Sequence, residues 1–195
     1  RAARLLDDAG LTVADGVRRT GAGEPVALEL LVASTRDAQL GGLWAESLAR
    51  LGVRLNVRRV DEAQYQSRRQ VYDYDLTVNR WAMSLSPGIE QRLYFGAEGR
   101  EEPGSRNYMG VADPAVDGAI DRLLEAEARE AFVAAVRDLD RALTDGVYVV
   151  PFGVLPATRI VHDAGLAHPE AESLYGWWGW WAGPGVWWRE DAGQG

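Results

Sequence analysis

The chain has 195 residues, of which 47% are apolar and 26% charged, as expected for an ordinary folded domain with a sizeable core. Its 29 acidic and 21 basic residues give a net charge of −8, and every basic residue is an arginine. The acidic balance argues against nucleic-acid binding, and the absence of cysteine excludes disulfides and thiolate metal sites.

The first third of the sequence predicts the end of a helix followed by a βαβ unit. Residues 1–9 have helical spacing, and residues 10–24 are rich in turn-forming glycines. Strand alternation over 28–32 precedes helical spacing over 37–51, and alternation returns over 53–58. This order predicts two parallel strands joined by a right-handed crossover.

The middle of the chain continues the alternation of helices and strands. A short helix is expected over 61–70 and a strand over 74–81. Two further helices are expected, over 113–124, with an Asp-Pro start, and over 132–143. Residues 147–150 are wholly apolar, which predicts a short strand buried on both faces. The fold class predicted from these patterns is α/β.

The loop after the strand at 74–81 is the best candidate for a binding site. Ligands gather beyond the carboxyl ends of strands in open α/β sheets. Trp81 offers a flat apolar surface with one N–H donor, Ser84 and Ser86 offer hydroxyls, and Glu90 offers a carboxylate. Trp81 could equally be a core aromatic that seals the end of the strand, and both interpretations stay open.

A second candidate lies in the segment 104–110. Arg106 can pair with a ligand carboxylate, and Asn107 can donate and accept toward a peptide backbone. For Asn107, a turn residue that closes its own loop is an equally good interpretation. The candidate ligand-binding residues are Trp81, Ser84, Ser86, Glu90, Arg106 and Asn107.

Enzyme motifs are weak in this sequence. No Gly-x-Ser-x-Gly, phosphate-binding glycine loop or zinc-binding histidine motif occurs, so neither catalysis nor a metal or other cofactor is expected. An α/β hydrolase would need a nucleophile–base pair, and His162 and His168 have no obvious partner. Four tryptophans between Trp177 and Trp181 could stack on sugar rings, although packing against another part of the protein is favoured.

Four motifs resemble the C-terminal part of bacterial extracellular solute-binding proteins of the oligopeptide type, the substrate receptors of ABC importers. They are the loop at 80–91, the Gly-Ser-Arg-Asn-Tyr-Met-Gly segment at 104–110, the Asp-Pro helix start at 113–117, and the segment at 145–151. Within this group the chain looks most like the branch that handles microcin C and related peptides, which carries a similar Ser-Leu-Ser-Pro-Gly-x-Glu-Gln-Arg loop.

The resemblance implies the C-terminal lobe of a bilobed, type II periplasmic-binding-protein fold, in a fragment of a longer receptor with its own signal peptide. Residues 1–24 would lead into the lobe, 25–150 would form it, and 151–195 would return toward the N-terminal lobe and end in the Trp-rich tail. The implied function is uptake of peptides or peptide-like ligands. Implied partners are that ligand, an inner-membrane ABC permease and the N-terminal lobe, in a periplasmic or lipid-anchored protein. A carbohydrate receptor that uses the Trp-rich tail is the alternative.

One position departs from the family pattern. In the receptors that this chain resembles, the tryptophan matching Trp81 is followed after two residues by an aspartate that holds the peptide's terminal ammonium. Ser84 stands at that position here. A neutral hydroxyl cannot act as the counter-ion of a buried ammonium. We therefore expect Glu90 to supply the charge, or the ligand to be modified or anchored differently.

Overall fold

A computed structural model gives the fold of the protein. The structure describes residues 1–81, 86–153, 161–168 and 187–189. The chain divides into two compact units, Arg1–Val149 and Val150–Gly195. Among the described residues, no helix is both long and apolar enough to cross a membrane.

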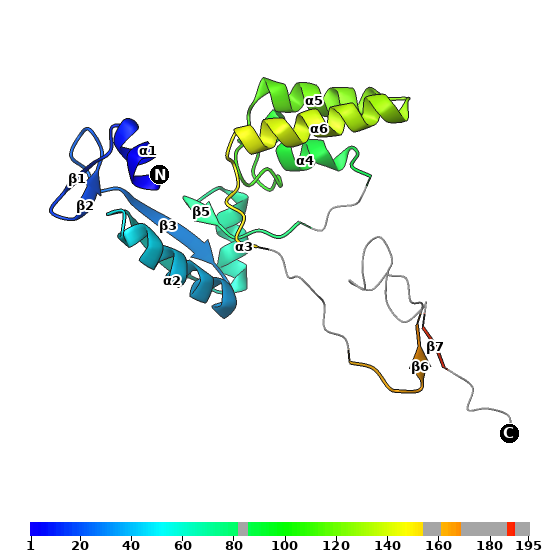
Figure 1. The fold of residues 1–195 in the computed structure, drawn as a ribbon, viewed down its shortest axis with the longest axis horizontal. Helices are drawn as coiled ribbons and strands as arrows, with labels where there is room; N and C mark the ends of the chain where they lie inside the picture. Colours follow the sequence, from blue (N-terminus) through cyan, green and yellow to red (C-terminus); the bar gives the residue numbers. More distant parts are fainter. Residues whose placement is uncertain (82–85, 154–160, 169–186, 190–195) are drawn as a thin grey trace. The chain divides into compact units, whose positions relative to one another are not determined.

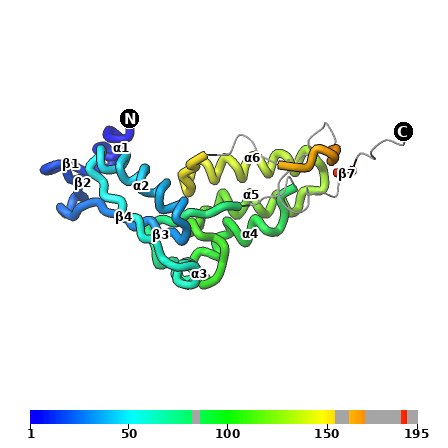
Figure 2. Tube along the Cα trace, turned by 90° about the horizontal axis from the view of Figure 1, so that it is seen from below, coloured from blue at the N-terminus to red at the C-terminus, as the bar shows by residue number. Residues whose placement is uncertain are grey.

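The centre of the first unit is a three-stranded parallel sheet (Figure 1). Its strands are β3 (Ala27–Val32), β4 (Arg54–Arg59) and β5 (Leu76–Thr77), in the order β4-β3-β5. The helices α2 (Thr35–Ala49) and α3 (Glu62–Gln70) make the connections, and Figure 2 follows this path. The predicted parallel βαβ unit is confirmed, whereas the strand predicted over 74–81 is paired only at its centre.

Local sequence signals explain where the two connecting helices begin and how closely α2 can approach the sheet. Ser34 and Asp61 each cap a helix, because their side chains accept the backbone N–H of the residue three positions on. Gly41 lets α2 pack against the sheet: a Cβ there would lie 2.7 Å from a methyl group of Leu30 and about 3 Å from those of Val57.

The two helices cover opposite faces of the sheet, as the side chains around β5 show. Leu76 and Val78 pack into the apolar cluster that α2 covers. Thr77, between them, lies 3.0 Å from the hydroxyl of Tyr65 on α3. Because successive residues of a strand point to opposite faces, the residues after β5 continue this alternation.

The N-terminal part forms a small hairpin that the sequence analysis treated only as a turn-rich connection. After α1 (Ala2–Asp8), strands β1 (Thr12–Ala14) and β2 (Val17–Arg19) pair antiparallel. Asp15 and Gly16 connect them with φ angles of 53° and 76°. Two positive φ angles in a two-residue loop are the mark of a type I′ hairpin turn.

A buried arginine joins this hairpin to its surroundings. Arg18 donates to a carboxylate oxygen of Asp7 at 2.6 Å, to the carbonyl of Leu11 at 2.7 Å and to that of Leu51 at 2.9 Å. The planar guanidinium has enough donors to satisfy all three acceptors at once. One side chain therefore connects α1, the hairpin and the end of α2.

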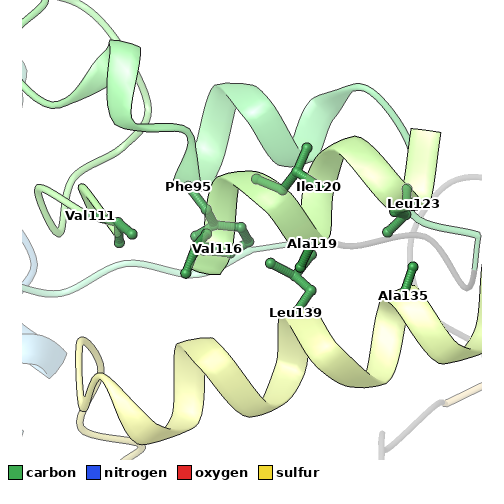
Figure 3. Packing of buried hydrophobic residues seen from close by; sticks show 8 residues of the cluster. All are labelled: Phe95, Val111, Val116, Ala119, Ile120, Leu123, Ala135 and Leu139. Atoms are coloured by element: carbon green, nitrogen blue, oxygen red, sulfur yellow. The ribbon is translucent and has the colours of Figure 1, made fainter. Parts of the chain in front are cut away.

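The remaining part of the first unit is helical. It contains α4 (Glu90–Phe95), the 3₁₀ turn η1 (Ala97–Gly99), α5 (Pro114–Glu125) and α6 (Arg129–Asp145). The Asp-Pro start predicted for α5 is confirmed, because Asp113 accepts the N–H of the second helical residue. Figure 3 shows the core between these helices. Its buried residues are Phe95, Val111, Val116, Ala119, Ile120, Leu123, Ala135 and Leu139.

The strand predicted over 147–150 is wrong. Val147 has a positive φ of 52°, and Val147, Val149 and Val150 are exposed. An apolar run becomes a buried strand only beside a partner strand, and no strand pairs with this segment among the described residues.

The described residues of the second unit form one small antiparallel pair. Strand β6 (Leu166–Ala167) pairs with β7 (Trp188–Arg189). The ring of Trp187 lies 4.8 Å from that of His162 and 5.1 Å from that of His168, measured between ring centroids. The Trp-rich segment from Trp177 to Trp181 lies outside the described residues.

Candidate functional site

The strand order makes the carboxyl ends of β3 and β5 a topological switch point. The chain leaves the central strand β3 toward β4 on one side, and it later returns to pair β5 on the other side. Connections that leave neighbouring strands in opposite directions create the switch point at which α/β sheets bind ligands. Residues 33–37, at the start of α2, and residues 78–81, after β5, therefore flank this switch point.

An ion pair bridges the two sides of the switch point. Arg80 donates through both terminal nitrogens to Asp37, at 2.5 and 3.3 Å. The Asp37 side chain is only 9% exposed, whereas that of Arg80 is 62% exposed. The hydrogen bond from Arg80 holds the pKa of Asp37 below its ordinary value, although burial acts in the opposite direction. The same bond raises the pKa of Arg80.

A second arginine, on the other face of the sheet, binds Asn79, the residue directly before Arg80. Arg69 on α3 is 8% exposed and donates to the side-chain oxygen of Asn79 at 3.0 Å. Its guanidinium carbon lies 3.8 Å from the ring centre of Tyr108 and 5.0 Å from that of Tyr65. Among the described residues it forms no ion pair, and its Nε has no hydrogen-bond partner. Asn79 and Arg80 are thus held from opposite sides.

Two tyrosines hold the candidate segment around Asn107 against the sheet. The hydroxyl of Tyr74 donates to the carbonyl of Tyr108 at 2.9 Å, and that of Tyr72 donates to the carbonyl of Gly99 at 2.6 Å. Burial raises the pKa of Tyr74 to about 12, although the positive charge of Arg69 opposes this rise. The Tyr74 hydroxyl therefore remains a hydrogen-bond donor throughout the physiological range.

Trp81 contacts the helical core with part of its surface and leaves another part exposed. It is half-buried against the helical core, with its ring centroid 6.1 Å from that of Phe95. Its indole N–H is buried and has no hydrogen-bond partner among the described residues. Ser86 is exposed, and Ser84 lies outside the described residues.

Glu90 is engaged in its own turn. Its carboxylate accepts the backbone N–H of Gly88 at 2.9 Å and the side-chain amide of Gln91 at 3.1 Å. Burial raises the pKa of Glu90, but these hydrogen bonds outweigh burial, so the pKa lies below its ordinary value. The carboxylate is thus ionised and already has local donors.

Asn107 and Arg106 have contrasting environments. The Asn107 side chain is fully buried, donates to the carbonyls of Gly96 and Val111 at 2.9 and 2.8 Å, and accepts the N–H of Val111 at 2.9 Å. These bonds fit the interpretation that Asn107 closes its own loop. Arg106 is exposed, with no hydrogen bond or ion pair to the described part of the chain.

The best-organised polar contact at the switch point, Asp37 with Arg80, is absent from the candidates drawn from the sequence. The two residues lie 43 positions apart, so spacing alone does not connect them. The available signal was positional. Asp37 lies in the first turn of the helix after β3, Arg80 follows β5, and the ends of these two strands form the switch point.

Known proteins resemble this chain over most of its length. No family model matches it. A candidate binding protein of Brucella melitensis is 41% identical over 179 residues, covering 89% of this chain and 29% of that protein. A peptide-binding candidate named YejA, from Agrobacterium fabrum, is 32% identical over 196 residues, covering 99% of this chain and 31% of that protein. The chain therefore spans less than a third of the length of these relatives.

The fold matches solved structures of the same kind. The crystal structure of a mannohexaose-bound periplasmic oligopeptide-binding protein from Thermotoga maritima aligns with a TM-score of 0.68 and 22% sequence identity. The alignment covers 77% of this chain and 29% of that one. The predicted α/β lobe of a periplasmic binding protein is thereby confirmed. The resemblance to the C-terminal part of extracellular solute-binding proteins of the oligopeptide type is confirmed by these relatives and by the fold.

Proposed function

We propose that the full-length protein is the substrate-binding component of an ABC importer and binds peptides or peptide-like ligands between two lobes. The observation that carries this function is the 32% identity to a peptide-binding candidate over 99% of the chain. A hinge closure on the ligand would exclude water and mark the receptor as loaded. In this role the protein performs no chemistry.

The proposed organisation follows from this function. Residues 25–150 contribute one lobe, and residues 151–195 return toward the N-terminal lobe of the same protein. The partners are that lobe and an ABC permease in the inner membrane, and the protein works in the periplasm or from a lipid anchor.

The proposed ligand wall lies at the carboxyl end of β5. Trp81 supplies an apolar surface there, and the hydroxyls of Ser84 and Ser86 follow in the loop. Arg106 adds an exposed guanidinium. Glu90 and Asn107 act indirectly, because their hydrogen bonds shape the two loops.

Native mass spectrometry of the full-length protein, purified without denaturation, tests this function. A retained mass that fragments as a short peptide or peptide conjugate is the expected result. Fragmentation would also show whether its N-terminus is free or blocked, which bears on Ser84. A protein that carries no peptide and retains none from a peptide mixture would refute the proposal.

A carbohydrate ligand is the second candidate, and one observation favours it. The similar oligopeptide-binding protein from Thermotoga maritima was crystallised with mannohexaose. A retained mass in multiples of a hexose would therefore move the assignment to sugars, and it would give the tryptophans of the tail a direct role.

A further inference from the structure

The ion pair with Asp37 explains neither the position of Arg80 at the end of β5 nor the large exposed fraction of its side chain. It follows β5 at the switch point, where ligands of α/β sheets bind. Its partner Asp37 is buried at the start of α2, and the backbone N–H of Asp37 is itself fixed by the cap residue Ser34. A rigid, buried carboxylate thus orients a side chain that is 62% exposed.

The guanidinium of Arg80 has unused donors on a defined edge. An arginine carries five N–H groups in a planar fork. The two terminal nitrogens of Arg80 each give one hydrogen bond to Asp37. The edge formed by Nε and one terminal nitrogen forms no hydrogen bond with the described residues. Such an edge matches the two oxygens of a carboxylate.

The charge balance at this edge favours an anionic group. Arg69 donates a hydrogen bond to Asn79, the residue directly before Arg80. Asp37 forms an ion pair with Arg80 and not with Arg69. Among the described residues, Arg69 has no carboxylate partner. The side chains bonded around Asn79 and Arg80 thus include two guanidiniums and one carboxylate, in a chain whose net charge is −8.

We propose that Arg80 binds a carboxylate of the ligand through its free edge, with Asp37 as the residue that positions it. The inference rests on the proposed peptide-binding function and adds the chemical group that is recognised. That group is either the C-terminal carboxylate of a peptide or an acidic side chain.

A competition experiment on the full-length protein tests this inference. The probe is an equimolar library of tri- to pentapeptides in three forms: free acids without Asp or Glu, the same peptides as C-terminal amides, and amides that contain one Glu. Bound peptides are quantified by mass spectrometry after separation from free peptide. The wild type should retain one of the two carboxylate-bearing forms over the plain amides by about tenfold or more, since a charged hydrogen-bonded contact is lost with the amide. The preferred form identifies which carboxylate is bound.

Variants separate recognition by Arg80 from general effects on folding. Arg80→Gln should abolish the preference while plain amides bind as before, and Asp37→Asn should weaken it because Arg80 loses its orientation. Arg58→Gln, at an exposed position on β4, should leave the preference unchanged. If Arg80→Gln does not fold, Arg80→Lys decides, because it keeps the charge but loses the fork and should reduce the preference.

Two outcomes would overturn the inference, and they differ from a failure of the proposed function. Peptides that bind equally well as acids, Glu-containing amides and plain amides would show that no carboxylate is recognised. A folded Arg80→Gln variant that keeps the wild-type preference would show that another residue recognises it. Failure to retain any peptide form would instead refute the peptide-binding function itself.

Discussion

Replacing Asn107 with alanine should destabilise the loop between η1 and α5. The effect should be on the loop alone, because the Asn107 side chain closes the loop and does not contact the ligand. The substitution removes three hydrogen bonds and leaves the carbonyls of Gly96 and Val111 and the N–H of Val111 without their partner. A net loss of about 1 kcal/mol for each bond gives about 3 kcal/mol, and buried groups left unsatisfied would increase this value. The equilibrium between closed and open loop should then shift by about 100-fold.

Hydrogen exchange followed by mass spectrometry measures this local effect in the full-length protein. Peptic fragments that contain Val111 should exchange about 100-fold faster in Asn107→Ala than in the wild type, within the limit set by local opening. Arg106→Ala provides the matched control, because the neighbouring side chain is exposed and its loss should leave this exchange rate unchanged.

Ligand binding provides the result that would refute the reasoning. If Asn107→Ala exchanges at the wild-type rate but loses affinity for the retained ligand, the side chain contacts the ligand, and the three hydrogen bonds do not stabilise the loop. If exchange accelerates while the folded fraction binds normally, the loop-closing role is confirmed.

Three further predictions concern packing and pH. Gly41→Ala should lower the melting temperature, because the new Cβ would lie 2.7 Å from a core methyl group. Gly42→Ala should stabilise the protein by about 0.5–1 kcal/mol, because no atom lies within 4 Å of the new Cβ and alanine favours the helix over glycine. Shifts of the two melts in the same direction would contradict this. The pKa of Tyr74 is raised by burial from 10.0 to about 12, so stability in urea titrations should decline as the pH rises through this window, and Tyr74→Phe should flatten the decline. The pKa of Asp37 is lowered, chiefly by Arg80, so its contribution is present above the unfolded value of 3.8 and is lost as the pH falls through the lower folded value. Asp37→Asn should remove that acid-range loss in the same titrations.

Local patterns in the sequence predicted much of the fold. The βαβ unit and the caps at Asp61 and Asp113 depend on residues within a few positions of one another, so periodicity and cap chemistry suffice. The β1–β2 hairpin was missed, although its Asp15-Gly16 turn is a strong local signal. The strand expected over 147–150 failed because its pairing depends on a partner that no local pattern supplies.

The candidate site was harder to predict, because its polar groups are decided by distant neighbours. The sequence allowed Asn107 to bind a ligand or to close its loop, and only the positions of Gly96 and Val111 favour the second role. The contact of Asp37 with Arg80 joins two ends of strands that become neighbours only when the sheet is assembled.

The opposite attachments of Asn79 and Arg80 have a mechanical consequence. A hinge needs residues that are free to change their backbone angles, and these two neighbours are tied to α3 through Arg69 and to α2 through Asp37. The stretch before Trp81 is therefore an anchor and not a pivot. A ligand bound to Arg80 would be connected through Asp37 to α2, so the sheet and its two helices would move together when the ligand moves.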